Sequence, residues 1–266
     1  MPTAAVPLQE GRGARDLVAA YSRHVAQNIY DDPEFQAGYR QLPRSEQGLA
    51  GAPEWPMVEA LLPALTGRDV VDLGCGYGAF ARWAAEQQAA SVDAFDLSEQ
   101  MLRRAGELTG PDAVITYTRA DLDTLRLAPA SYDLAYSALV LHYLTDLPRF
   151  VGMVHTALRP GGTFVFTCEH PVFTAPTDAT WIEHDGRRTW PLVRYGEEGE
   201  RVRDWLAPGV RKQHRTVGTL LNTVLDAGFA IRRVLESLPS AEQVEAHPEL
   251  AEERDRPMFL MVAADS

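Results

Sequence analysis

One short stretch limits what this chain can fold into more than any other: residues 70–78, which read Val-Val-Asp-Leu-Gly-Cys-Gly-Tyr-Gly. The apolar run ends in three closely spaced glycines, and a helical pattern follows over residues 80–88. Glycines suit such a turn because the backbone has to bend tightly and let a ligand come close to the helix N-terminus. The stretch therefore predicts a buried strand, a ligand-binding turn and a helix in an α/β sheet.

The rest of the chain repeats this alternation of short apolar runs and helical segments, which is typical of a parallel sheet. We expect strands over residues 70–73, 91–95, 114–117, 132–136, 163–166, 229–235 and 258–263, and helices over residues 57–65, 80–88, 99–107, 147–158 and 219–226. Residues 170–216 break the alternation because they are rich in proline, glycine, tryptophan and charge. The pattern predicts an open α/β sheet with an N-terminal extension and one long insertion after the fifth strand.

Four parts of the chain follow from this pattern. The expected parts are a tail and helical cap (1–50), a ligand-binding core (51–169), a lid or substrate insertion (170–216) and a segment that completes the core sheet (217–266). Within the cap, Val18, Tyr21, Val25 and Ile29 have the spacing of one helical face.

Charge and composition exclude several classes of function. The 266 residues carry a net charge of −12, and such an acidic chain repels a nucleic-acid backbone. No apolar run reaches the roughly 18 residues of a membrane helix, and the N-terminus has no hydrophobic signal core. The two cysteines lie far apart in sequence, which predicts neither a disulfide framework nor a cysteine metal site. We expect a cytoplasmic protein without a metal, a nucleic-acid partner or a membrane partner.

Acidic residues near the glycine turn distinguish between two cofactors. Asp96 ends the second expected strand, where a carboxylate can bind both ribose hydroxyls of an adenosine. Asp72 precedes the turn, where it would repel the pyrophosphate of NAD but suits the positive groups of S-adenosylmethionine; capping of the turn by this carboxylate explains it equally well. Asp121 follows the third strand and can meet the adenine amino group. We therefore favour S-adenosylmethionine, with an NAD(P)-dependent Rossmann oxidoreductase as the alternative.

Five segments carry a resemblance to a known family. Residues 69–78, 93–101, 120–122, 131–144 and 158–162 resemble the successive motifs of the class I S-adenosylmethionine-dependent methyltransferases. The resemblance covers roughly residues 52–170 and returns in the closing strands. It implies a Rossmann-like, doubly wound, seven-stranded sheet whose last strand is antiparallel. It also implies methyl transfer from S-adenosylmethionine, with S-adenosylhomocysteine as product.

The resemblance assigns cofactor-binding roles by position. It places Gly74, Cys75 and Gly76 under the methionine part, Asp96 on the ribose, Leu97 and Met101 against the adenine, Asp121 and Leu122 at the adenine edge, and Ser137 near the sulfonium. Met101 fits a plain core position equally well, because it would lie on an amphipathic helix.

Three histidines are candidates for a catalytic base, which removes a proton from the acceptor. His142 follows the fourth expected strand, His170 leaves the fifth in Glu169-His170-Pro171, and His214 ends the insertion in Lys212-Gln213-His214-Arg215-Thr216. In the first alternative, one of them acts on the acceptor, and the carboxylate of Glu169 orients His170. In the second, each imidazole is a buried side chain bound by neighbouring backbone groups.

The insertion combines aromatic and arginine side chains. Its aromatic residues are Phe173, Trp181, Trp190, Tyr195 and Trp205, and its arginines are Arg187, Arg188, Arg194, Arg201, Arg203, Arg211 and Arg215. Such a segment is either a lid that holds a partly flat substrate and binds its carboxylate, or a subdomain that packs its own aromatics and pairs its arginines with nearby glutamates.

These observations predict a bacterial enzyme that methylates a small-molecule acceptor in secondary or peripheral metabolism. A protein of the same fold that binds S-adenosylmethionine without methyl transfer is a further alternative. Whether oxygen, nitrogen or carbon accepts the methyl group stays open, as does the oligomeric state.

Overall fold

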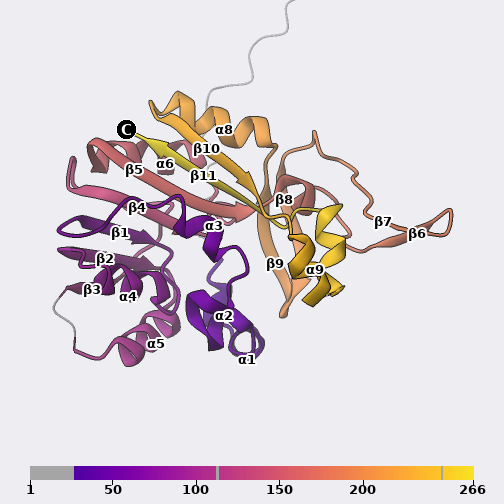
Figure 1. Ribbon diagram of the computed structural model, residues 1–266, viewed down its shortest axis with the longest axis horizontal. Coiled ribbons are helices and arrows are strands. Elements are labelled where there is room, and N and C mark those ends of the chain that lie inside the picture. The colour runs from indigo at the N-terminus through magenta and orange to yellow at the C-terminus, as the bar shows by residue number, and fades with distance from the viewer. Residues whose placement is uncertain (1–26, 112–113, 247) are drawn as a thin grey trace, which may run out of the picture.

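A seven-stranded sheet forms the centre of the computed structural model, which describes residues 27–111, 114–246 and 248–266. The strands are β1 (Asp69–Leu73), β2 (Ser91–Asp96), β3 (Ile115–Arg119), β4 (Tyr132–Ala138), β5 (Leu158–Glu169), β10 (Ala230–Glu236) and β11 (Phe259–Asp265). Their order across the sheet is β10-β11-β5-β4-β1-β2-β3 (Figure 1). Pairing is parallel from β5 to β3, and β11 is antiparallel to both of its neighbours. The predicted Rossmann-like sheet with a reversed last strand is confirmed.

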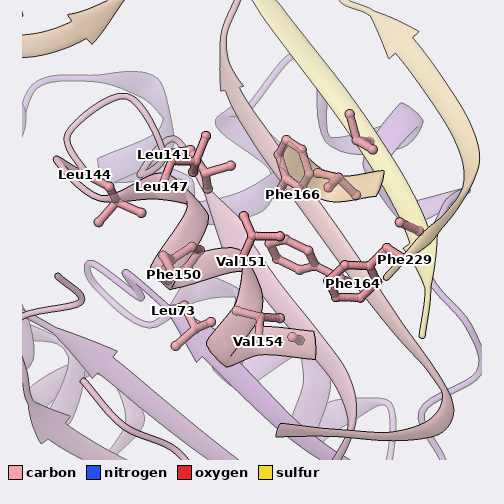
Figure 2. Close-up of a cluster of buried hydrophobic side chains, with 14 of the residues drawn as sticks. Leu73, Leu141, Leu144, Leu147, Phe150, Val151, Val154, Phe164, Phe166 and Phe229 are labelled. Carbon is pink, nitrogen blue, oxygen red and sulfur yellow. The ribbon is translucent and has the colours of Figure 1, made fainter. Parts of the chain in front are cut away.

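Helices cover both faces of the sheet, so it has two hydrophobic cores. The four longer helices are α4 (Ala79–Glu86), α5 (Glu99–Thr109), α6 (Leu147–Ala157) and α8 (Val217–Asp226). Neighbouring residues of β1 point to opposite faces, as the period of a strand requires. Val70 packs in the core that includes Phe80 of α4, whereas Val71 packs in the core that includes α6. Figure 2 shows Phe150 and Val154 of α6 facing the strands in that second core.

The N-terminal segment consists of short helices. They are η1 (Ile29–Asp31), α1 (Pro33–Tyr39), α2 (Pro43–Glu46), η2 (Gly48–Gly51) and α3 (Trp55–Glu59). The helix predicted over residues 57–65 is therefore wrong in extent. Pro63 explains its early end, because proline disfavours helical backbone in the residue before it and cannot donate a helical hydrogen bond. Of the predicted helical face in the cap, Val18, Tyr21 and Val25 lie outside the described residues.

The insertion after β5 folds into a short helix and two hairpins. These are α7 (Pro171–Thr174), the pair β6 (Ile182–His184) and β7 (Arg187–Thr189), and the pair β8 (Gly199–Trp205) and β9 (Ala207–His214). The β8–β9 hairpin packs on the N-terminal segment, where Ala207 and Val210 share a small core with Ile29 and Phe35. Two segments far apart in sequence therefore meet over the same end of the sheet.

The chain closes with α9 (Ala241–Ala246) and η3 (Pro248–Arg254) before β11. None of the helices within the described residues is long and apolar enough to span a membrane.

Candidate active site

A cavity of about 470 Å³ lies at the carboxyl ends of the parallel strands. Its floor is formed by residues that directly follow β1, β2, β3 and β4, together with Glu169 at the end of β5. Its roof comes from the N-terminal segment, through Tyr30 and Tyr39, and from the β8–β9 hairpin, through Trp205. Sheets of this topology bind ligands at this edge, and the volume is typical of a small-molecule site.

The glycine turn after β1 has the geometry that the sequence predicts. Gly74, Gly76 and Gly78 have φ values of +89°, +52° and +71°, which L-residues with a side chain rarely adopt. A Cβ atom on Gly74 would lie 2.1 Å from Cγ2 of Val140, so the loop after β4 packs directly against the turn. Gly74 and Gly76 line the cavity. The turn therefore brings backbone close to any ligand held there.

Asp96 fixes the turn from the neighbouring strand. Its Oδ2 atom accepts a hydrogen bond from the Gly76 amide at 2.8 Å, and its Oδ1 atom accepts one from the Ser98 amide at 2.9 Å. Burial raises the pKa of Asp96, although these two amides oppose the rise. A carboxylate has about four acceptor positions, so both oxygens can still bind hydroxyl groups of a ligand.

Seven of the predicted cofactor residues lie together. Gly74, Gly76, Asp96, Leu97, Met101, Asp121 and Leu122 all line the cavity. Cys75, Ser137 and Asp72 are buried and are not among its lining residues. The Ser137 hydroxyl donates to the Leu73 carbonyl at 2.8 Å, so it supports the end of β1.

Asp72 is a buried carboxylate with an unfilled position. It is 1% exposed, and its Oδ2 atom has no hydrogen-bond partner among the described residues. Burial and the nearby charge of Asp96 raise the pKa of Asp72 well above its usual range. A buried carboxylate oxygen without a donor is costly. The arrangement therefore fits a ligand that brings a positive group to this side of the turn.

His142 is the one predicted catalytic histidine that lines the cavity. Its Nδ1 atom accepts a hydrogen bond from the Glu169 amide at 3.3 Å. Burial lowers the pKa of His142 to about 4, with Lys212 and Arg215 acting in the same direction and Glu169 opposing them. The neutral ring then carries its proton on Nε2. In this arrangement His142 is a hydrogen-bond donor, because its lone pair is already engaged.

We expect His142 to remain neutral between pH 5.5 and 8. In ¹⁵N-labelled protein, its ring nitrogens should show the Nε2–H tautomer throughout this range and titrate only near pH 4. Because the folded-state pKa is depressed, the stability that His142 contributes is present above its unfolded pKa of about 6.5 and is lost as the pH falls toward 4. Titration of this ring near pH 6.5 would show that burial does not keep it neutral and would restore His142 as a base at neutral pH.

His170 and His214 do not line the cavity. His170 accepts at Nδ1 from the Val172 amide, and its Nε2 atom pairs with Glu236 at 2.9 Å rather than with Glu169. In His214, Nε2 lies 2.9 Å from the Tyr195 carbonyl and Nδ1 lies 2.7 Å from the Thr174 hydroxyl. Both nitrogens of each ring are engaged within the protein, so the geometry favours packing roles. The predicted orientation of His170 by Glu169 is wrong.

The insertion combines features of both predicted alternatives. Phe173 and Trp205 line the cavity as a lid would. Trp190 instead stacks on Phe173, and Trp181 meets Trp190 edge-on, as in a subdomain with its own core. Most of the arginines serve the protein itself: Arg201, Arg203 and Arg215 donate to main-chain carbonyls, and Arg194 pairs with Glu197 at 2.8 Å. Arg211 lines the cavity.

An ion pair that sequence analysis did not identify connects Glu169, in the floor of the cavity, to the β8–β9 hairpin. Lys212 of β9 donates to Oε1 of Glu169 at the end of β5, and their side chains are 4% and 11% exposed. The Lys212 ammonium also lies 4.8 Å from the ring centroid of Trp205 and 5.9 Å from that of Tyr143. Lys212 is the only lysine of the chain and alternates with buried Val210 and His214. That alternation is the signal that could have indicated its burial.

No group of His, Cys, Asp and Glu side chains among the described residues has the arrangement of a metal site.

Comparisons with known proteins extend these observations. A family model described as a methyltransferase domain matches residues 71–166. The solved structure of an S-adenosylmethionine-dependent methyltransferase from Mesorhizobium loti is similar, with a TM-score of 0.78 and 56% identity over 82% of this chain and 100% of that one. An uncharacterized protein of Haemophilus influenzae is 31% identical over 248 residues, or 89% of this chain and 96% of that protein.

A further relative is similar over a shorter segment. The malonyl-[acyl-carrier protein] O-methyltransferase of Pectobacterium atrosepticum is 35% identical over 127 residues, which are 48% of this chain and 49% of that enzyme. The likeness to this relative is therefore confined to about half of its length.

Proposed function

Because the chain belongs to the S-adenosylmethionine-dependent methyltransferases, we propose that it transfers a methyl group to a small-molecule acceptor held in the cavity beside that cofactor. S-adenosylmethionine supplies a methyl group that its sulfonium already makes electrophilic. What the chain has to provide is alignment of the two molecules and exclusion of water. The cavity has a floor from five strand ends and a roof from two separate segments, which suits both tasks.

The observation that carries this proposal is the geometry of Asp96. Its carboxylate is held by the Gly76 and Ser98 amides in the lining of the cavity, with acceptor positions left for two ribose hydroxyls. Leu97 and Met101 lie beside it as apolar surface for an adenine, and Asp121 follows the next strand. Cys75 and Ser137 would support this site indirectly, Cys75 as a buried residue of the turn and Ser137 through its hydrogen bond to the end of β1.

Asp72 favours S-adenosylmethionine over a nicotinamide cofactor. Its unpartnered oxygen lies behind the turn on which a dinucleotide would place its pyrophosphate. Burial and Asp96 already push this carboxyl group toward its neutral form. A nearby ammonium or sulfonium would favour its charged form, whereas a pyrophosphate would disfavour that form further.

The remaining part of the cavity would hold the acceptor. It is bounded by His142, Tyr143, Glu169, Trp205 and Phe173. We propose a free small molecule from secondary or peripheral metabolism, and a cytoplasmic enzyme that acts on neither nucleic acid nor membranes, in keeping with the net charge of −12. The acyl-carrier-protein substrate of the Pectobacterium atrosepticum enzyme is not transferred to this chain, because only half of that enzyme is matched.

Calorimetric titration of the purified protein with S-adenosylmethionine, S-adenosylhomocysteine and NADH tests the cofactor. We expect micromolar binding of the two adenosyl ligands and no heat from NADH. Binding of NADH alone would overturn the proposal and turn the loop into a dinucleotide site. Release of S-adenosylhomocysteine in the presence of an acceptor then tests methyl transfer, whereas retained cofactor without product would favour a binding protein of the same fold.

A further inference from the structure

The ion pair of Glu169 and Lys212 lies in the part of the cavity that the proposed function leaves for the acceptor. Glu169 lines the cavity together with His142, and its own amide binds the His142 ring. Lys212 reaches it from β9, whose neighbouring Gln213 amide donates to the His142 carbonyl at 2.6 Å. The main chain of Glu169 is therefore bound to the loop after β4, and its carboxylate is bound to the hairpin.

One oxygen of this carboxylate is left without a donor. Oε1 accepts from Lys212, whereas Oε2 is buried and has no hydrogen-bond partner among the described residues. Three carboxylate oxygens of the described residues share this condition, in Asp72, Glu169 and Glu253. Of these three residues, only Glu169 lines the cavity. An anionic oxygen that is buried without a donor is costly, so a missing donor is to be expected there.

Lys212 keeps Glu169 charged and also limits what can approach it. Burial pushes the pKa of Glu169 upward, but His142 and Lys212, the latter through both its charge and its hydrogen bond, hold it below its usual range. The Lys212 ammonium is itself enclosed by the faces of Trp205 and Tyr143. The positive end of the pair is thus covered by protein, and the negative end is the one with a free position.

We propose that Oε2 of Glu169 accepts a hydrogen bond from an N–H or O–H group of the acceptor, so that the enzyme selects amines or hydroxyl compounds and rejects carboxylates. A protic group completes the coordination of the buried oxygen, and a charge-assisted bond of this kind is stronger than a neutral one. A carboxylate at the same place would meet Glu169 with like charge in a site of low dielectric. The inference rests on the proposed function, because it assumes that this part of the cavity holds the acceptor.

The single lysine provides a direct probe of this subsite. Protein labelled with [ζ-¹⁵N]lysine contains one side-chain ammonium, that of Lys212, which touches Glu169. With S-adenosylhomocysteine present at saturation, we would titrate benzylamine, benzyl alcohol and benzoate, and the same trio built on cyclohexylmethyl and butyl skeletons. We expect the amines or alcohols to shift the Lys212 resonance and to bind roughly 10- to 100-fold more tightly than the matched acids. A response to amines alone would indicate that the methyl acceptor carries a positive charge. A response to both amines and alcohols would indicate that a neutral hydrogen-bond donor is sufficient.

Two variants separate recognition of the probe by Glu169 from a general effect of negative charge in the cavity. In Glu169→Gln, the amine or alcohol of each trio and the matched carboxylate should bind with affinities within about threefold of each other, since the anionic oxygen is gone. Glu200→Gln removes a carboxylate that lines the same cavity but is 41% exposed, and it should leave the preference unchanged. Equal selectivity in wild type and Glu169→Gln would overturn the proposal.

Failure of this inference is distinguishable from failure of the proposed function. If S-adenosylhomocysteine does not bind in the calorimeter, the cofactor assignment fails. If it binds but no probe shifts the Lys212 resonance, or if acids bind best, the role of Glu169 is overturned. The free oxygen would then belong to a water molecule in the void of about 10 Å³ that Glu169 and His142 also line.

Discussion

Replacing Asp96 by alanine is expected to lower the affinity for S-adenosylmethionine by roughly 100- to 10,000-fold. Asp96 lines the cavity, and its carboxylate can bind both ribose hydroxyls. Each hydrogen bond to a charged group contributes about 1.5–3 kcal/mol, and every 1.4 kcal/mol is about tenfold in affinity. Calorimetric titration of the variant with S-adenosylmethionine and S-adenosylhomocysteine measures the loss.

Asp93 offers a matched control on the same strand. It lies three residues earlier in β2, accepts a hydrogen bond from the Tyr132 hydroxyl at 2.7 Å and does not line the cavity. Asp93→Ala should cost stability without changing cofactor affinity by more than about threefold, because it removes only a structural hydrogen bond. If Asp96→Ala bound the cofactor as tightly as this control, the placement of the site would be wrong.

The part of the site that could be predicted from sequence consists of local signals. A strand followed by alternating glycines can form only a few backbone paths, and the positive φ values of Gly74 and Gly76 belong to that turn. The position of Asp96 follows from the same register, since β1 and β2 pair side by side with Leu73 opposite Phe95. The seven strands of the sheet were likewise visible as short apolar runs, because both of its faces are covered.

The contacts that the end of β5 makes with the hairpin and with β10 could not be predicted, because they connect segments that are distant in sequence. Glu169 stands beside His170 in sequence, which suggested that the two side chains act together. Consecutive residues at the end of a strand point in different directions, so Glu169 meets Lys212 of the hairpin and His170 meets Glu236 of β10. The hairpin itself was not predicted, because a lysine and a histidine occupy buried positions of β9. The strand therefore lacks the alternation of apolar and polar residues that indicates a strand.

The largest expected effect on stability comes from Lys212→Met. The substitution keeps an apolar stem between Trp205 and Tyr143 but leaves the buried charge of Glu169 without its partner. Breaking one side of a buried ion pair costs about 3–5 kcal/mol. Urea unfolding at pH 7.5 should therefore show a loss of that size in the free energy of unfolding.

Two further variants isolate the contribution of the pair. In Lys212→Met combined with Glu169→Gln, most of the lost stability should return, because no uncompensated charge remains. Arg211→Met alters the neighbouring residue of β9, which is 57% exposed and forms a long ion pair of 4.0 Å with Glu200. Its effect on the free energy of unfolding should therefore stay within about 0.5 kcal/mol. A double variant that is no more stable than Lys212→Met would show that lost packing, and not an orphaned charge, explains the effect.

The difference in unfolding free energy between the wild type and Lys212→Met should depend on pH, and the sign of the pKa shift of Glu169 gives its direction. In the wild type, the pKa of Glu169 is held below its usual range, so its contribution to stability is present above the unfolded pKa and is lost as the pH falls through the folded one. Without Lys212, burial raises the same pKa, and the stability of the variant should increase as the pH falls toward the ordinary value of a glutamate. The two unfolding free energies should therefore converge between pH 8 and about pH 5. A constant difference across that range would mean that Glu169 does not carry the charge on which its role in acceptor recognition depends.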